Sequence, residues 1–162
     1  MAVDILKGVI ATLFVSQIRV NAAGSPIPID IELLPLLAGI AAILGHIWTV
    51  FAGFKGGKGV GTAAGVFAAL FPIPTLVCFL VWGLIVIFVR IVSVASMAAA
   101  ICLPISLFVM EKWFDRPVHD VLFYFTVLLA ILIVFTHRSN VKRLLNGTEN
   151  RFNPIWNRKA DK

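Results

Sequence analysis

The stretch Gly-Phe-Lys-Gly-Gly-Lys-Gly-Val-Gly-Thr at residues 53–62 joins two long apolar segments, and the rest of the chain is interpreted around it. Its glycines permit backbone conformations that β-carbons forbid, so successive N–H groups can turn inward around an anion. Two lysines add positive charge, and a helix predicted from Thr62 onward would begin with N–H groups free to bind an anion. The stretch therefore predicts a phosphate-binding loop formed by Lys55, Gly56, Gly57, Lys58, Gly59 and Thr62.

Two other interpretations of this loop compete with phosphate binding. A Walker loop needs four residues between its first glycine and Gly-Lys-[Ser/Thr]. Only three residues separate Gly53 from Gly57, and Lys58 is followed by Gly59, so ATP hydrolysis is excluded. Glycines at 57, 61 and 65 are also spaced as in close packing of membrane helices. The two lysines favour anion binding over packing alone.

Composition indicates an integral membrane protein. The chain has 162 residues, 60% of them hydrophobic and only 14% charged, whereas soluble domains contain about 25% charged residues. The net charge of +6 comes from loops and the C-terminal tail, which favours anionic headgroups as partners rather than nucleic acid. Both cysteines lie in apolar runs, and no metal-ligand spacing occurs. We therefore expect no metal and no cofactor.

The apolar segments predict an all-α, polytopic helix bundle that forms one domain over residues 1–162. About six helices are expected, at residues 3–20, 33–54, 60–71, 74–89, 91–110 and 121–136. The helix that follows the glycine-rich loop is too short to cross a bilayer, and Pro72 and Pro74 are expected to break it. A charged loop is expected at residues 111–120.

The distribution of basic residues predicts the topology. If the glycine-rich loop faces the cytoplasm, eleven Lys and Arg residues lie inside and three outside, as the positive-inside rule requires. Both termini then face the cytoplasm, together with Asp4, Lys7, Arg90 and a basic juxtamembrane helix and tail at residues 137–162.

Residues 136–151 form a second polar constellation at that side. They predict an amphipathic helix ending at Gly147, with His137 and Asn140 on one face. The simpler interpretation is a basic helix that binds anionic lipid. The functional one is that His137 exchanges a proton and Asn140 orients a hydroxyl or carbonyl. For His46, a catalytic role and an interhelical hydrogen bond that orients the loop both remain open.

The chemistry expected at this side of the membrane is acyl or phosphoryl transfer to a phosphorylated headgroup. Backbone N–H groups, fixed cations and two histidines are expected there, with few carboxylates. Such a site suits two anionic substrates better than a nucleotide–Mg²⁺ complex, which needs carboxylate oxygens. The apolar helices beside it would accommodate an acyl chain.

These motifs resemble those of the bacterial acyl-phosphate:glycerol-3-phosphate acyltransferases over nearly the whole chain. Their central motif is matched by Gly45-His46 and Phe54-Lys55-Gly56-Gly57-Lys58-Gly59-Val60 with Thr62. Their C-terminal motif is matched by Thr136-His137-Arg138, Asn140 and Gly147-Thr148-Glu149-Asn150-Arg151. The signature that opens the family's second helix is matched by Asp4-Ile5-Leu6-Lys7-Gly8. The family's first helix and its Ser-Gly-Asn-x-Gly-Ala-Thr-Asn motif have no counterpart, so we expect the sequence to begin at the second helix.

The resemblance implies a seven-helix enzyme of the bacterial inner membrane with its site on the cytoplasmic side. It would transfer a fatty acyl group from acyl phosphate, supplied by a soluble enzyme, to glycerol-3-phosphate, giving lysophosphatidate for phospholipid synthesis. Supporting roles are implied for Asp4, Lys7, His46, Arg138 and Glu149. The hydroxyl proton could pass to the departing phosphate, to His137 or, less favoured, to His46. An organic-phosphate transporter, a lipid-binding scaffold and an inactive truncated homologue are the alternatives.

Overall fold

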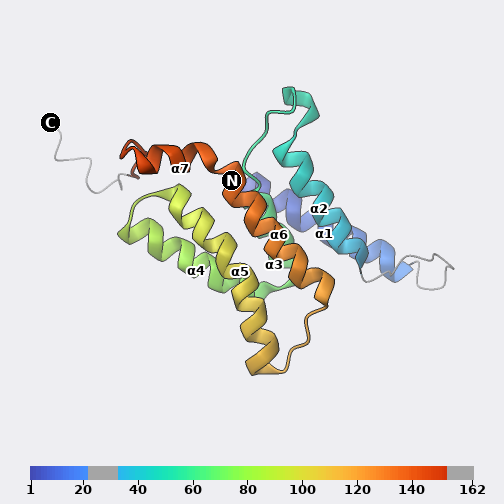
Figure 1. Cartoon of the computed structure of the whole chain (residues 1–162). Coiled ribbons are helices and arrows are strands. Elements are labelled where there is room, and N and C mark those ends of the chain that lie inside the picture. The colour runs from blue at the N-terminus through green and yellow to red at the C-terminus, as the bar shows by residue number, and fades with distance from the viewer. Residues whose placement is uncertain (22–32, 153–162) are drawn as a thin grey trace. The chain divides into compact units, whose positions relative to one another are not determined.

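The computed structural model describes residues 1–21 and 33–152, in which every regular element is a helix (Figure 1). The predicted all-α class is therefore confirmed. The helices are α1 (Ala2–Asn21), α2 (Leu34–Ile47), α3 (Val60–Leu70), α4 (Pro72–Phe88), α5 (Val92–Phe114), α6 (Asp120–Thr136) and α7 (Arg138–Leu145), with a short 3₁₀ turn, η2 (Val50–Ala52). They divide into two compact units, Met1–Leu76 and Val77–Lys162.

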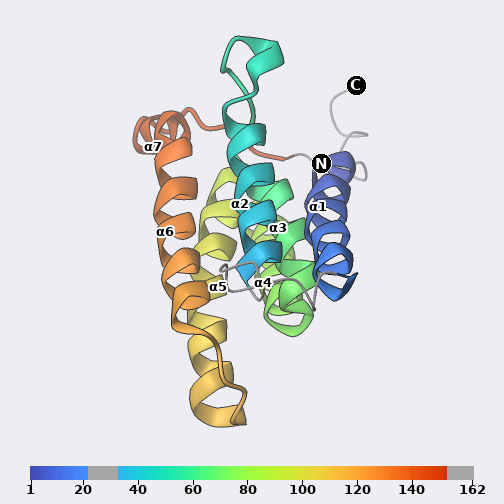
Figure 2. The ribbon, with the colours of Figure 1, turned by 90° about the vertical axis from the view of Figure 1, so that its right-hand side faces the viewer.

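In the first unit, α1 and α3 pack at backbone contact, with α2 beside both (Figure 2). A β-carbon on Gly8 of α1 would collide with the carbonyl oxygen of Thr62, and one on Gly65 of α3 would collide with the carbonyl oxygen of Ile5. The two glycines thus serve the same contact from opposite sides. This confirms the packing interpretation of Gly65 and places the start of α3 beside the start of α1.

The apolar core of the first unit is formed by α2 and α3. Ile43 of α2 and Val66 and Phe67 of α3 are at most 1% exposed. Val66 lies against Gly39, where a β-carbon would collide with its side chain. Gly39 thus provides the space into which Val66 packs.

In the second unit, α5 packs against α6, and α7 follows α6 after a bend of 56°. Among the described helices, α5 alone is long and apolar enough to cross a membrane by itself, while α2, α3 and α4 are shorter apolar helices. Leu107 of α5 and Ile133 of α6 are buried in the core of this unit. α7 ends as predicted, because Gly147 takes a positive φ of 69° and its N–H and that of Thr148 donate to carbonyls of the last turn.

Three predicted boundaries were wrong. α2 ends at Ile47 rather than at residue 54, so its 14 residues span only about 21 Å. Trp48 leaves helical geometry, and the Thr49 hydroxyl donates to the carbonyls of Gly45 and His46 at the end of α2. α5 continues past residue 110 to Phe114, shortening the charged loop. The break expected before Pro72 is confirmed, since α3 ends at Leu70, but α4 begins at Pro72 rather than at residue 74 because the first turn of a helix needs no N–H from proline.

Candidate active site

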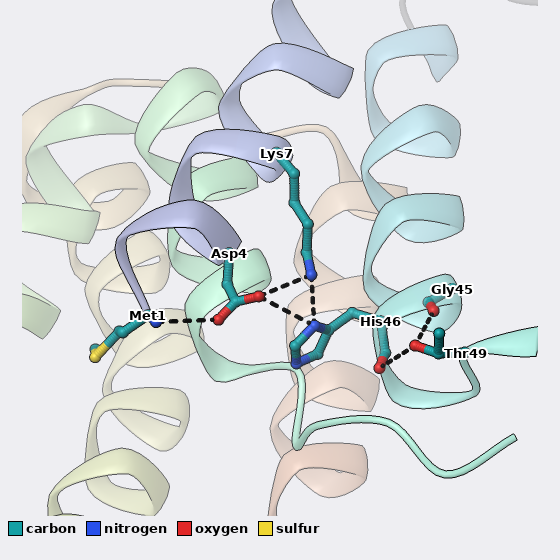
Figure 3. Close-up of polar contacts among 6 residues, drawn as sticks. All are labelled: Met1, Asp4, Lys7, Gly45, His46 and Thr49. Atoms are coloured by element: carbon teal, nitrogen blue, oxygen red, sulfur yellow. Dashed lines mark hydrogen bonds and ion pairs between the residues drawn. The ribbon is translucent and has the colours of Figure 1, made fainter. Parts of the chain in front are cut away.

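The first polar cluster joins α1 to the last turn of α2 (Figure 3). Lys7 donates from Nζ to Oδ1 of Asp4 over 2.8 Å, and the same Nζ lies 2.5 Å from Nδ1 of His46. Nδ1 of His46 lies 3.4 Å from Oδ1 of Asp4, and the amino group of Met1 lies 3.3 Å from Oδ2. An interhelical hydrogen bond, one of the two roles left open for His46, is therefore present.

The glycine-rich loop is fixed to the end of α2 through its backbone. The N–H of Gly56 donates to the carbonyl of Ile47 over 3.1 Å, and that of Gly57 donates to the carbonyl of His46 over 3.0 Å. The N–H of Lys55 likewise donates to the carbonyl of Ala52. The expectation that the N–H groups of Gly56 and Gly57 surround an anion was therefore wrong, because both donate to α2. The side chain of Lys55 is exposed.

The unpaired donors lie just after this point, at the start of α3. Gly59 is the N-cap residue of α3 and has a positive φ of 83°. As a glycine it has no side chain that could accept a hydrogen bond from the first turn of the helix. Within the described residues, the N–H groups of Gly59, Val60, Gly61 and Thr62 have no backbone acceptor. The hydroxyl of Thr62 is fully buried and has no hydrogen-bond partner. Half-buried Lys58 precedes this turn, so the anion site suited by the geometry begins at Lys58 rather than at Gly53.

The second polar cluster, in the other unit, is centred on Glu149. Its Oε1 accepts from Nδ2 of Asn140 over 2.6 Å and from the hydroxyl of Ser93 over 2.7 Å. Its Oε2 accepts from Nε of Arg143 over 2.7 Å. These bonds, the one from Asn140 foremost, lower the pKa of Glu149 to about 2. Glu149 is therefore an anion at neutral pH, and the nitrogen end of the Asn140 amide points toward it.

His137 lies at the junction of α6 and α7 and is 2% exposed. Its Nδ1 is 2.7 Å from the carbonyl oxygen of Ile133. Because a carbonyl only accepts, Nδ1 carries the hydrogen, and in the neutral ring the lone pair is on Nε2. His137 thus has the tautomer expected of a base. Arg138 next to it stacks over Phe135 with its guanidinium carbon 4.8 Å from the ring centroid.

Two residues of the second cluster were not predicted from the sequence. Ser93 was given no role in the site, although it is buried and donates to Glu149 across 56 positions. Arg143 was given no role in the site. A lone serine in an alanine-rich run carries no signal for this contact, whereas the six-residue spacing of Arg143 and Glu149 could have suggested the ion pair.

The fold and these clusters describe a protein of apolar helices in which a lysine and unpaired backbone N–H groups lie at the start of α3. Comparison with known proteins narrows the class. The model of the family described as glycerol-3-phosphate acyltransferase matches residues 1–147. The glycerol-3-phosphate acyltransferases of Chlorobium phaeobacteroides (strain BS1) and Shouchella clausii (strain KSM-K16) are 42% and 40% identical, over 91% and 93% of this chain and 72% and 69% of their own lengths.

Solved structures give the same result. The glycerol 3-phosphate form of PlsY (YgiH), an integral membrane glycerol 3-phosphate acyltransferase, superposes with a TM-score of 0.69 at 37% identity, covering 93% of this chain and 68% of that chain. Its lysophosphatidic acid form gives a TM-score of 0.70 at the same identity. The chain belongs to the glycerol-3-phosphate acyltransferase family of membrane enzymes. The resemblance seen in the motifs is confirmed.

Proposed function

We propose that the chain transfers a fatty acyl group from acyl phosphate to a hydroxyl of glycerol-3-phosphate. The hydroxyl oxygen attacks the acyl carbon, the bond from that carbon to the phosphate oxygen breaks, and inorganic phosphate and lysophosphatidate are released. The relatives are named for glycerol-3-phosphate, and PlsY was solved in glycerol 3-phosphate and lysophosphatidic acid forms. No cofactor is required, because acyl phosphate is already activated.

One observation carries the phosphate-binding part of the proposal. The first turn of α3 has unpaired N–H groups and the buried, unpartnered hydroxyl of Thr62, directly after Lys58. A phosphoryl group there would accept from the helix start and neutralise the adjacent lysine. Such donors lower the free energy of the transition state as negative charge collects on the leaving phosphate.

The second cluster would position the attacking hydroxyl. Glu149 holds the nitrogen end of the Asn140 amide, and in this proposal the amide orients the hydroxyl group. The departing phosphate carries its own basic oxygens and takes the proton. The competing route uses the Nε2 lone pair of His137 as general base.

The reaction is tested with purified protein in lipid vesicles, supplied with acyl phosphate and glycerol-3-phosphate. We expect equal amounts of phosphate and lysophosphatidate to form, and Lys58→Ala to abolish turnover. Lys112→Ala is the matched control, since Lys112 is 56% exposed and, among the residues that the structure describes, pairs only with neighbouring Glu111. Uptake of glycerol-3-phosphate without product would support the transporter instead, and full turnover of Lys58→Ala would remove the proposed phosphate site.

His137→Asn separates the two proton routes. The asparagine amide can still donate to the carbonyl of Ile133, as Nδ1 does, but it has no basic nitrogen. If phosphate takes the proton, this variant keeps substantial activity. A loss approaching the roughly 10⁴-fold upper range for general bases would assign the proton to His137.

We also propose the cellular setting. The chain would be a single multi-pass domain of a bacterial inner membrane, with both termini and the site on the cytoplasmic side, as the eleven inner against three outer basic residues indicate. A soluble enzyme that makes acyl phosphate would supply the donor. Cysteine accessibility at introduced positions in the 53–59 loop and at 115–118, measured in sealed vesicles, tests the orientation.

A further inference from the structure

The ammonium group of Lys7 lies between a carboxylate and an imidazole, and this arrangement has a consequence for the phosphate site. We infer that Lys7 and Asp4 are positioning residues. They hold His46 in its Nε2–H tautomer, so that His46 donates a hydrogen bond to the phosphoryl group at the start of α3 instead of acting as a base. The inference rests on the proposed function for the identity of that phosphoryl group.

The tautomer follows from the donor count around Nδ1. An ammonium group only donates, so at 2.5 Å from Nζ of Lys7 the Nδ1 of His46 must accept. A hydrogen on Nδ1 would point at the ammonium hydrogens, while Asp4 is farther away at 3.4 Å and already accepts from Lys7 at 2.8 Å. The neutral imidazole therefore carries its hydrogen on Nε2.

The Nε2 atom faces the glycine-rich loop. A β-carbon on Gly57 would collide with Nε2, so the ring edge lies directly over this glycine. Within the described residues Nε2 has no hydrogen-bond partner. The side chain of His46 is 17% exposed, so a ligand can reach it. Nε2–H is thus a preorganised donor whose orientation is set from the opposite side of the ring.

This donor lies beside the first turn of α3. Gly59, the N-cap residue of α3, packs on Ile47, the residue after His46. A β-carbon added to Gly59 would lie 2.9 Å from Cδ1 of Ile47. Asp4 also lies against the first turn of α3, because a β-carbon added to Gly61 would lie 3.0 Å from Cβ of Asp4. The Lys7 contact offsets the charge of Asp4, which would otherwise repel an anion at this helix start.

Histidine-selective ¹⁵N NMR of the protein in detergent tests the tautomer without any turnover. The chain has three histidines, and the signal lost in His46→Gln assigns His46. We expect a bonded hydrogen on Nε2 and a free lone pair on Nδ1 at neutral pH, and a mixture of tautomers in Lys7→Met. Millimolar inorganic phosphate should shift the Nε2 signal of wild type. A hydrogen on Nδ1, a cationic ring, or an Nε2 signal unmoved by phosphate would overturn the inference.

Kinetics of two substitutions test what the donor does. In His46→Gln the amide nitrogen can take the place of Nε2, whereas in His46→Asn it takes the place of Nδ1, and neither residue is a base. We expect His46→Gln to keep KM for glycerol-3-phosphate or acyl phosphate within about 3-fold and His46→Asn to raise it about 10–100-fold, the range for a hydrogen bond to a charged group. Equal losses of kcat in both variants would assign His46 as a base and overturn the inference.

The two readouts also separate this inference from the proposed function. If the vesicle assay shows no acyl transfer while phosphate still shifts a protonated Nε2, the substrate assignment fails and the role of Lys7 stands. If acyl transfer occurs but the hydrogen is on Nδ1, the function stands and the role of Lys7 is wrong.

Discussion

Asn140 donates its amide hydrogen to Glu149 over 2.6 Å, across a nine-residue separation that contains the end of α7. Ser93 of α5 donates to the same oxygen. The carboxylate therefore connects Asn140 of α7 to Ser93 of α5 and holds the nitrogen end of the Asn140 amide toward itself. One residue thus links the packing of a helix to the geometry of the candidate site.

Replacing Glu149 tests this link. Glu149→Ala removes the acceptor for Asn140, Ser93 and Arg143 at a side chain only 6% exposed. Leaving buried donors unsatisfied costs about 1–3 kcal/mol, so we expect lower thermal stability and faster hydrogen exchange over residues 138–145. Glu111→Gln is the control, since in the described part of the chain Glu111 pairs only with its neighbour Lys112. Wild-type exchange in Glu149→Ala would contradict the role given to the carboxylate.

The low pKa of Glu149 predicts a dependence of stability on pH. The pKa is about 2 in the folded protein and 4.5 in the unfolded chain, so folding favours the anion. The resulting stabilisation is complete above pH 4.5 and is lost as the pH falls from 4.5 toward 2. We expect the contribution of Glu149 to the thermal midpoint to be constant from pH 7 to 5 and to decrease below pH 4.5. In Asn140→Leu the fall should be shallower, because the main cause of the low pKa is gone.

The sequence predicted most of the helices because apolar runs and polar breaks mark them directly. It could not locate the end of α2, because Trp48, Val50 and Phe51 continue the apolar run. That boundary lies where Trp48 leaves helical geometry, with φ −115° and ψ 66°, and where the Thr49 hydroxyl donates to the last carbonyls of the helix. Hydropathy records neither of these features.

The candidate site shows the same division. The sequence predicts that His137 and Asn140 lie near one another, since they are only three positions apart, although His137 precedes α7 instead of lying within it. The hydrogen bonds from the N–H groups of Gly56 and Gly57 to α2 were not predicted. A glycine permits many conformations, and the sequence does not specify which carbonyl each N–H will bind. Contacts across long separations, such as Lys7 with His46, 39 positions apart, need the folded chain.

The contact between α1 and α3 predicts unequal effects of two glycine substitutions. In Gly65→Ala the new methyl group would collide with the carbonyl of Ile5, a backbone atom that cannot move aside cheaply. We expect a loss of about 1–3 kcal/mol, seen as a lower thermal midpoint in detergent. Gly83→Ala in α4 has open space within 4 Å and should be neutral or raise the midpoint, since alanine favours a helix. Equal effects of the two substitutions would argue against close packing of α1 and α3.

Gly57→Ala tests the position of the His46 ring over the glycine-rich loop. The added methyl group would collide with Nε2, while Gly57 does not have the positive φ that would itself penalise alanine. We expect the ring to be displaced and KM to rise about 10-fold or more, the cost of one misplaced hydrogen bond to an anion. In a His46→Ala background the collision is absent, so the same substitution should change KM little further. Residues in contact behave non-additively in this way. If the two substitutions are instead additive, Gly57 acts on the loop directly and the imidazole does not lie over it in solution.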